Sequence, residues 1–178
     1  MSQPFVFGVA GYKNTGKTTL VARLIAALSD EGFKVGAIKH DRHGFFAHPK
    51  GTDSAQFALS GAKHTIVADD QGHVAMDLMQ DEPSQVERLL SMMTGVDIVI
   101  VEGFKTTPMK KWVLIEQDRF DEHIKAYRVP DFSCDKEFHH FVMGWVVPKP
   151  PLRVVGSLCP VYHRDDIRGM IDVIVRYT

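Results

Sequence analysis

Apolar positions in the first part of the chain follow the pattern of a strand, a helix and a second strand. The run Pro4–Gly11 is apolar and ends in glycine, Lys17–Ser29 carries apolar residues at helical spacing, and Lys34–Lys39 is again a strand-like run. Gly32 ends the helix between them. A β-α-β unit of this length joins two parallel strands, so the pattern predicts a parallel sheet.

Later segments predict further strands and helices and one hairpin. In order, these are a loop at 40–52, a helix at Asp53–Ser60, hairpin strands at His64–Ala68 and His73–Leu78, a helix at Pro83–Met93, strands at Asp97–Val101, Trp112–Glu116 and Phe141–Val147, and a closing helix at Asp165–Tyr177. Thr52 or Asp53 is the expected N-cap of the helix at Asp53–Ser60. The β-branched run Asp97–Val101 is typical of a central strand buried on both faces. We therefore predict one α/β domain over residues 1–178, with a mostly parallel central sheet and an added β-hairpin.

Composition narrows the classes of partner. The chain is 44% hydrophobic and 24% charged with a formal net charge of -1, which favours a globular protein and gives no electrostatic reason to bind nucleic acid. The two cysteines, Cys134 and Cys159, fit no disulfide or metal-binding spacing and are expected to be reduced. No apolar run approaches the roughly 18 residues that span a bilayer. The expectation is a cytoplasmic protein without membrane contact.

The strongest motif in the chain is a phosphate-binding loop. Its sequence GYKNTGKT matches G-x-x-x-x-G-K-[ST] between a strand and a helix, which predicts a three-layer P-loop NTPase fold. Lys17 is expected at the β- and γ-phosphates of a nucleoside triphosphate, Thr18 on Mg²⁺, and Thr19 at the α-phosphate. The predicted nucleotide-binding residues are Gly11, Tyr12, Lys13, Asn14, Thr15, Gly16, Lys17, Thr18 and Thr19.

Two carboxylates are candidate catalytic groups. Glu102 ends the buried run after Asp97 and can hold Mg²⁺ together with Thr18, since Mg²⁺ prefers carboxylate and hydroxyl oxygens. Asp97, at the other end of that run, is expected to be structural. Asp53 could orient the attacking water if the 40–52 loop folds over the phosphates, or it could cap a helix, and the sequence leaves both open.

Several motifs in order resemble the MobB family of molybdopterin-guanine dinucleotide biosynthesis adapter proteins. They are the phosphate loop, K-H-x-x-H at 39–43, Gly51-Thr52-Asp53-Ser54, and V-E-G-F-K at 101–105, and the resemblance covers about residues 5–117. It implies GTP binding with Mg²⁺, at most slow GTP hydrolysis, a homodimer, and assistance to the guanylyltransferase that acts on molybdopterin. The chain departs from the family at 45–48, where an acidic residue is usual, and at Thr52, where lysine is commoner.

Three further side chains are candidates for phosphate or partner contact: His40, His43 and Lys105. The nine histidines also raise a GTP-driven metallochaperone as an alternative, although no convincing fourth zinc ligand accompanies the loop histidines. A small-molecule kinase is a second alternative, but its usual arginine-rich lid is missing from 118–140. No arginine finger or dedicated glutamine is visible either, which favours slow turnover.

Overall fold

The structure is a computed structural model that describes residues 3–40, 51–62, 64–78, 85–105, 107–120, 141–149 and 159–178. The chain divides into two compact units, and each is described by itself. The larger unit combines Met1–His40 with Arg88–Thr178, and the smaller unit is Asp41–Glu87. Along the chain, the smaller unit thus follows the first two strands of the larger unit and precedes its other four.

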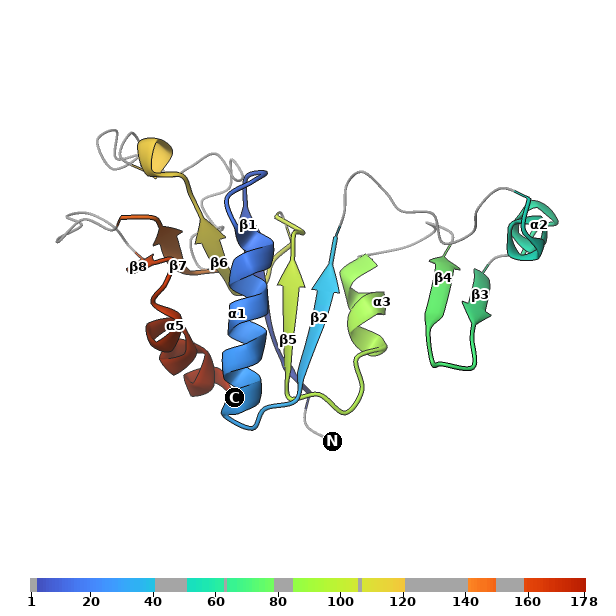
Figure 1. Ribbon diagram of the computed structural model, residues 1–178, viewed down its shortest axis with the longest axis horizontal. Helices are drawn as coiled ribbons and strands as arrows, with labels where there is room; N and C mark the ends of the chain where they lie inside the picture. Colours follow the sequence, from blue (N-terminus) through green and yellow to red (C-terminus); the bar gives the residue numbers. More distant parts are fainter. Residues whose placement is uncertain are drawn as a thin grey trace. The chain divides into compact units, whose positions relative to one another are not determined.

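The larger unit is built on a six-stranded parallel sheet with the order β2-β5-β1-β6-β7-β8 (Figure 1). Its strands are β1 Phe5–Gly11, β2 Val35–Lys39, β5 Ile98–Glu102, β6 Lys111–Leu114, β7 Val142–Val147 and β8 Val161–His163. Its helices are α1 Lys17–Asp30, α5 Ile167–Ile174 and the short 3-10 helix η2 Val175–Tyr177, and α3 Gln85–Ser91 begins at the boundary of the two units. Because all strands are parallel, their carboxyl ends meet at one edge.

Both faces of this sheet are covered, because successive residues of a strand pack alternately into hydrophobic clusters on its two sides. Ile98 and Ile100 of β5 belong to the core formed with α1 and α5, whereas Val99 and Val101 pack with Ile38 and with hydrophobic residues from α3 and the segment after β5. Every residue of β5 is buried. A strand buried on both faces needs this continuous apolar run. The predicted three-layer α/β fold and the central position of this strand are confirmed.

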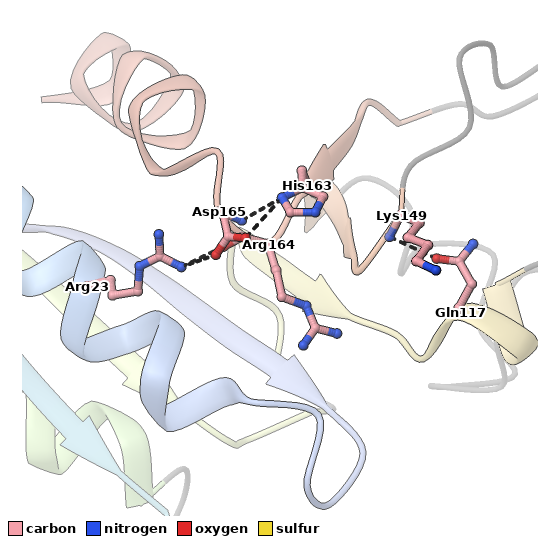
Figure 2. A network of polar contacts seen from close by, with 6 residues as sticks. All are labelled: Arg23, Gln117, Lys149, His163, Arg164 and Asp165. Carbon is pink, nitrogen blue, oxygen red and sulfur yellow. Dashed lines mark hydrogen bonds and ion pairs between the residues drawn. The ribbon is translucent and has the colours of Figure 1, made fainter.

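Polar contacts tie the far strands to the rest of the larger unit (Figure 2). Arg23 of α1 donates to the Asp165 carboxylate at 2.5 Å, just after β8, and the backbone N–H of Asp165 donates to His163 Nδ1 at 3.1 Å. The backbone N–H of Lys149, after β7, donates to Gln117 Oε1 at 2.9 Å. This second bond holds the short helical segment 117–120 beside the end of β7.

The smaller unit contains helix α2 Asp53–Leu59 and the antiparallel pair β3 His64–Ala68 and β4 Val74–Leu78, which confirms the predicted hairpin. The N-cap of α2 is Thr52, whose hydroxyl accepts from the backbone N–H of Ala55 at 3.3 Å. Gly61 follows the helix with φ of 99°, as a helix-ending glycine does.

The structure differs from the sequence prediction at β6, which covers Lys111–Leu114 rather than Trp112–Glu116, and at the C-terminal end. Strand β8 was not predicted, because three residues are too few to show a period. The closing helix α5 begins at Ile167 rather than Asp165, since the Asp166 carboxylate accepts from Gly169 N and caps it, and it gives way to η2 at Val175. Cys159 is buried, and this burial raises the pKa of its thiol. Within the described ranges, no helix has the length and apolar character needed to cross a membrane.

Candidate functional site

The loop between β1 and α1 has the backbone of an anion cradle. Gly11 lies so close to β6 that a Cβ there would meet the Leu114 carbonyl oxygen at 2.7 Å. Asn14 and Gly16 adopt left-handed φ values of 64° and 89°, and α1 begins directly afterwards. Among the described residues no side chain caps α1. Its first N–H groups and the positive end of its dipole are therefore available to an anion.

Lys17 is held over this loop. Its Nζ donates to the Tyr12 carbonyl at 2.5 Å, and the Thr15 hydroxyl donates to the same oxygen at 2.9 Å. Burial of the ammonium lowers the pKa of Lys17, while the Glu102 carboxylate raises it and the Lys39 ammonium lowers it. Lys17 thus points across the loop from the start of α1, the position from which this lysine reaches the terminal phosphates in P-loop proteins.

Thr18 and Glu102 meet at the mouth of the loop. The Thr18 hydroxyl donates to Glu102 Oε1 at 2.9 Å, and Lys39 Nζ lies 3.8 Å from the same carboxylate oxygen. Glu102 is only 8% exposed, whereas the Lys39 side chain is more than half exposed. A buried carboxylate needs such partners because burial without them is costly.

Strand register produces this meeting. In the parallel pairing Val9 of β1 and Lys39 of β2 are both opposite Glu102 of β5. The ends of three neighbouring strands therefore deliver the loop, the carboxylate and a cation to one edge of the sheet. At the opposite end of β5, the Asp97 carboxylate accepts from the backbone N–H of Lys34 at 2.8 Å, a structural contact as expected.

The chain turns sharply after Glu102. Gly103 and Phe104 have φ values of 101° and 44°, and a Cβ on Gly103 would meet His40 Cβ at 3.0 Å. The positive φ of Phe104 is unfavourable for a side chain with a Cβ. Its ring stacks on the His40 ring with centroids 4.3 Å apart, and the His40 backbone N–H donates to the Glu102 carbonyl. His40 therefore supports this turn from the end of β2.

A buried lysine anchors the same segment. Lys111, at the start of β6, is 1% exposed, and its Nζ donates to the carbonyls of Lys105 at 2.9 Å and Thr107 at 2.7 Å. Burial lowers the pKa of Lys111 to about 8. Lys111 was not predicted as a site residue, because lysine is rarely buried and no motif distinguishes this position.

Two cations lie over the ring of Tyr12, the second residue of the phosphate loop. The Arg119 Cζ is 4.1 Å and the Lys105 Nζ is 4.8 Å from the ring centroid. Lys105 was predicted as a phosphate or partner contact, and it lies beside the loop. Arg119 was not predicted as a site residue.

The remaining predicted residues lie elsewhere. Asp53 is the exposed first residue of α2 in the smaller unit, and because Thr52 caps the helix, capping does not account for Asp53. His43 lies outside the described residues. Within the described part of the chain, no group of three or more histidine, cysteine, aspartate or glutamate side chains could hold a metal.

Thr18 and Glu102 fit a Mg²⁺ ion that is shared with a nucleotide. The pair supplies one hydroxyl and one buried carboxylate oxygen, already 2.9 Å apart. Mg²⁺ in nucleotide sites takes one or two protein oxygens, and its other ligands are phosphate oxygens and water. The donor set therefore matches that use of Mg²⁺.

A protein-family model and two proteins from other organisms are similar in sequence to this chain. The family model of molybdopterin guanine dinucleotide synthesis protein B, MobB, matches residues 6–130. The chain is 31% identical over 171 residues to the molybdopterin-guanine dinucleotide biosynthesis adapter protein of Escherichia coli K12, covering 94% of this chain and 90% of that protein. It is 32% identical over 129 residues to the Haemophilus influenzae adapter protein, covering 68% and 72%.

Solved structures agree in fold. The MobB protein homolog from Bacillus stearothermophilus aligns with a TM-score of 0.61 at 23% identity, covering 97% of this chain and 99% of that one. A crystal structure of molybdopterin-guanine biosynthesis protein B aligns with a TM-score of 0.63 at 20% identity, covering 98% and 100%. With a family model that spans most of the chain and a relative at 31% identity that matches nearly all of it, this chain belongs to the MobB family.

Proposed function

We propose that this member of the MobB family is a GTP-binding adapter that assists the guanylyltransferase forming molybdopterin guanine dinucleotide. The observation that carries the nucleotide part is the contact of Thr18 with the buried Glu102 beside Lys17. These three groups are the ones that a P-loop needs for phosphates and Mg²⁺. The adapter part follows the printed names of the Escherichia coli and Haemophilus influenzae relatives.

Each loop residue has a proposed task. The N–H groups of the loop bind phosphate oxygens, Lys17 binds the β- and γ-phosphates, and Thr19 contacts the α-phosphate. Thr18 and Glu102 hold Mg²⁺, which when bound neutralises charge on the β- and γ-phosphate oxygens. Asp53 orients the attacking water, and hydrolysis is slow. The active species is a cytoplasmic homodimer that presents GTP, and with it molybdopterin, to the partner enzyme.

A calorimetric titration of the purified protein tests this proposal. GTP, ATP and their diphosphates are titrated in the presence of Mg²⁺. We expect a preference for GTP in the wild-type protein and no nucleotide binding by Lys17→Ala, because the loop then lacks the cation for the terminal phosphates. Retained binding by Lys17→Ala would refute the cradle assignment. An ATP preference would leave the P-loop intact and remove the guanine nucleotide from the proposal.

The adapter part has its own measurement. The purified protein is mixed with GTP and the guanylyltransferase of the same organism. Formation of molybdopterin guanine dinucleotide is then compared with a reaction that lacks the purified protein. We expect the wild-type protein to increase the yield and Lys17→Ala to fail to do so. An equal effect of the two proteins would separate the adapter function from nucleotide binding.

A further inference from the structure

Arg119 and Lys105 reach the phosphate loop from two segments that are separate in the sequence. Lys105 follows the turn after β5, and Arg119 lies in the helical segment after β6. Both cations lie over the ring of Tyr12, with the Arg119 Cζ at 4.1 Å and the Lys105 Nζ at 4.8 Å from its centroid. Two positive side chains thus gather at one residue of the loop.

Tyr12 marks the end of the loop where the terminal phosphate is expected. Its carbonyl accepts from Lys17 Nζ, the group that reaches the β- and γ-phosphates in this motif. The Thr15 hydroxyl donates to the same carbonyl, so the backbone of Tyr12 is fixed within the loop. A cation over the Tyr12 ring is therefore beside the Lys17 end of the cradle.

Both cation-bearing segments are anchored beside the two cations, one through its backbone and the other through neighbouring side chains. The buried Lys111 donates to the Lys105 carbonyl at 2.9 Å. Gln117 accepts from the backbone N–H of Lys149, and Phe120 is 3% exposed in the core beneath. The side chains can therefore change partner while the backbone around them stays in place.

The contacts that Arg119 makes in the structure are weak ones. Its Nε lies 3.4 Å from the Glu116 carboxylate, and both side chains are about half exposed. Exposed ion pairs and exposed cation–π contacts each contribute little, whereas a charge-assisted bond to phosphate is about twice as strong as a neutral hydrogen bond. A phosphate group at this end of the loop would compete successfully for Arg119.

From this geometry we infer that Arg119 and Lys105 form a cation pair that binds the terminal phosphate of a nucleoside triphosphate held in the loop of the same chain. This inference rests on the nucleotide binding proposed above. The pair contacts the γ-phosphate but not the α- or β-phosphate, so it makes the protein distinguish a triphosphate from a diphosphate. The arginine is supplied in cis, by the segment after β6.

The test compares triphosphate and diphosphate affinities of single variants by calorimetry. Arg119→Gln and Lys105→Gln keep a polar side chain and remove the charge. We expect each to weaken GTP binding by roughly tenfold and GDP binding by less than about twofold, because only the terminal phosphate loses a charged partner. Arg168→Gln is the matched control, since Arg168 pairs with Glu31 at the other end of α1 and its loss changes net charge equally.

Three results would overturn the inference. An equal loss of GTP and GDP affinity in Arg119→Gln, or no loss at all, would remove Arg119 from the terminal phosphate while leaving the proposed nucleotide site standing. A second result is that the GDP-loaded wild-type protein binds inorganic phosphate, that GDP-loaded Arg119→Gln does not, and that the ratio of GTP to GDP affinity is the same in both proteins. The cation pair would then bind the phosphate of a second ligand. If wild-type protein binds no nucleotide, the proposed function and this inference fail together.

Discussion

Glu102 shows how much chemistry one buried carboxylate can organise. Its oxygen accepts from the Thr18 hydroxyl and lies 3.8 Å from Lys39 Nζ, although only 8% of the residue is exposed. In the Mg²⁺ complex proposed above, this oxygen would bind the ion together with the Thr18 hydroxyl. Its charge also opposes the lowering of the Lys17 pKa by burial.

Replacing Glu102 by Gln should weaken the Mg²⁺ dependence of GTP binding, because an amide oxygen carries no full charge for the ion. We expect affinity in excess Mg²⁺ to fall by roughly tenfold, equivalent to about 1.4 kcal/mol, and affinity without Mg²⁺ to change little. Titrations with and without the metal measure this. Asp97→Asn, at the opposite end of β5, is the control, and an unchanged metal dependence in Glu102→Gln would make that carboxylate a bystander.

Lys111 should give the protein an unusual alkaline stability profile. Its folded pKa is about 8 and its ordinary value is 10.5. Between these values the unfolded chain binds a proton that the folded protein has lost, so the free energy of unfolding rises with pH. The cost of the buried charge is fully present below pH 8 and is relieved as pH increases to 10.5.

Denaturant unfolding at several pH values measures the effect. Relative to Lys111→Met, which cannot titrate, the wild-type protein should gain on the order of 3 kcal/mol across this interval. Lys34→Met, a lysine with an exposed side chain, should keep the wild-type profile. Parallel profiles for the wild-type protein and Lys111→Met would show that the Lys111 ammonium is not the group whose burial is relieved.

At the scale of elements, the turn after β5 should be sensitive to substitution. Gly103 has a φ of 101°, and a Cβ there would meet His40, the residue that directly follows β2. The turn also carries Phe104, which stacks on His40, and Lys105, which lies over Tyr12. A change in the backbone of the turn would therefore displace both Lys105 and the stacked rings of Phe104 and His40.

Gly103→Ala should destabilise the protein by roughly 2 to 4 kcal/mol, from the left-handed backbone and the close contact with His40. GTP affinity should fall as well, since Lys105 is displaced. Gly95→Ala is the matched control: its φ is 72°, but a Cβ there meets nothing within 4 Å. It should cost about 1 to 2 kcal/mol from the backbone alone and leave GTP affinity unchanged. Thermal unfolding and calorimetry distinguish the two variants.

The elements that sequence reasoning recovered are those with a strong local pattern. A motif identifies the loop at Gly11–Thr18 and a continuous apolar run identifies β5, so the sequence alone locates both. Strand β8 has three residues and no visible period. Arg119 and Lys111 were not predicted, for two other reasons. Arg119 lies over Tyr12 because β6 pairs with β1, which brings together segments that are distant in sequence. Lys111 has partners close in sequence, but lysine is rarely buried and no motif distinguishes its position.

On the scale of the whole molecule, the groups around the phosphate loop all lie in one of the two units. The phosphate loop, Glu102, Lys39 and the cations over Tyr12 belong to the larger unit, whereas Asp53 belongs to the smaller unit. The larger unit also contains the sheet and the three hydrophobic clusters. Nucleotide binding and hydrolysis should therefore be separable by removing the insertion.

Replacing residues 41–84 by a flexible Gly/Ser linker should leave a folded larger unit that still binds GTP. Long linkers cost little closure entropy, so the linker can be generous in length. Hydrolysis should be lost, because Asp53 is removed with the insertion. Cooperative unfolding, calorimetry and phosphate release measure the three properties. Asp53→Asn in the full chain is the companion variant, and normal hydrolysis in either protein would exclude Asp53 from the water.

The strand order has one more consequence. In the sequence β2-β5-β1-β6, strands from before the insertion alternate with strands from after it, and each neighbouring pair is joined by a parallel ladder. A cut within the insertion would leave two polypeptides, one with β1 and β2 and the other with β5 and β6, whose strands alternate in the sheet. The nucleotide site could then be assembled by fragment complementation from two separately expressed halves, neither of which holds both the phosphate loop and Glu102.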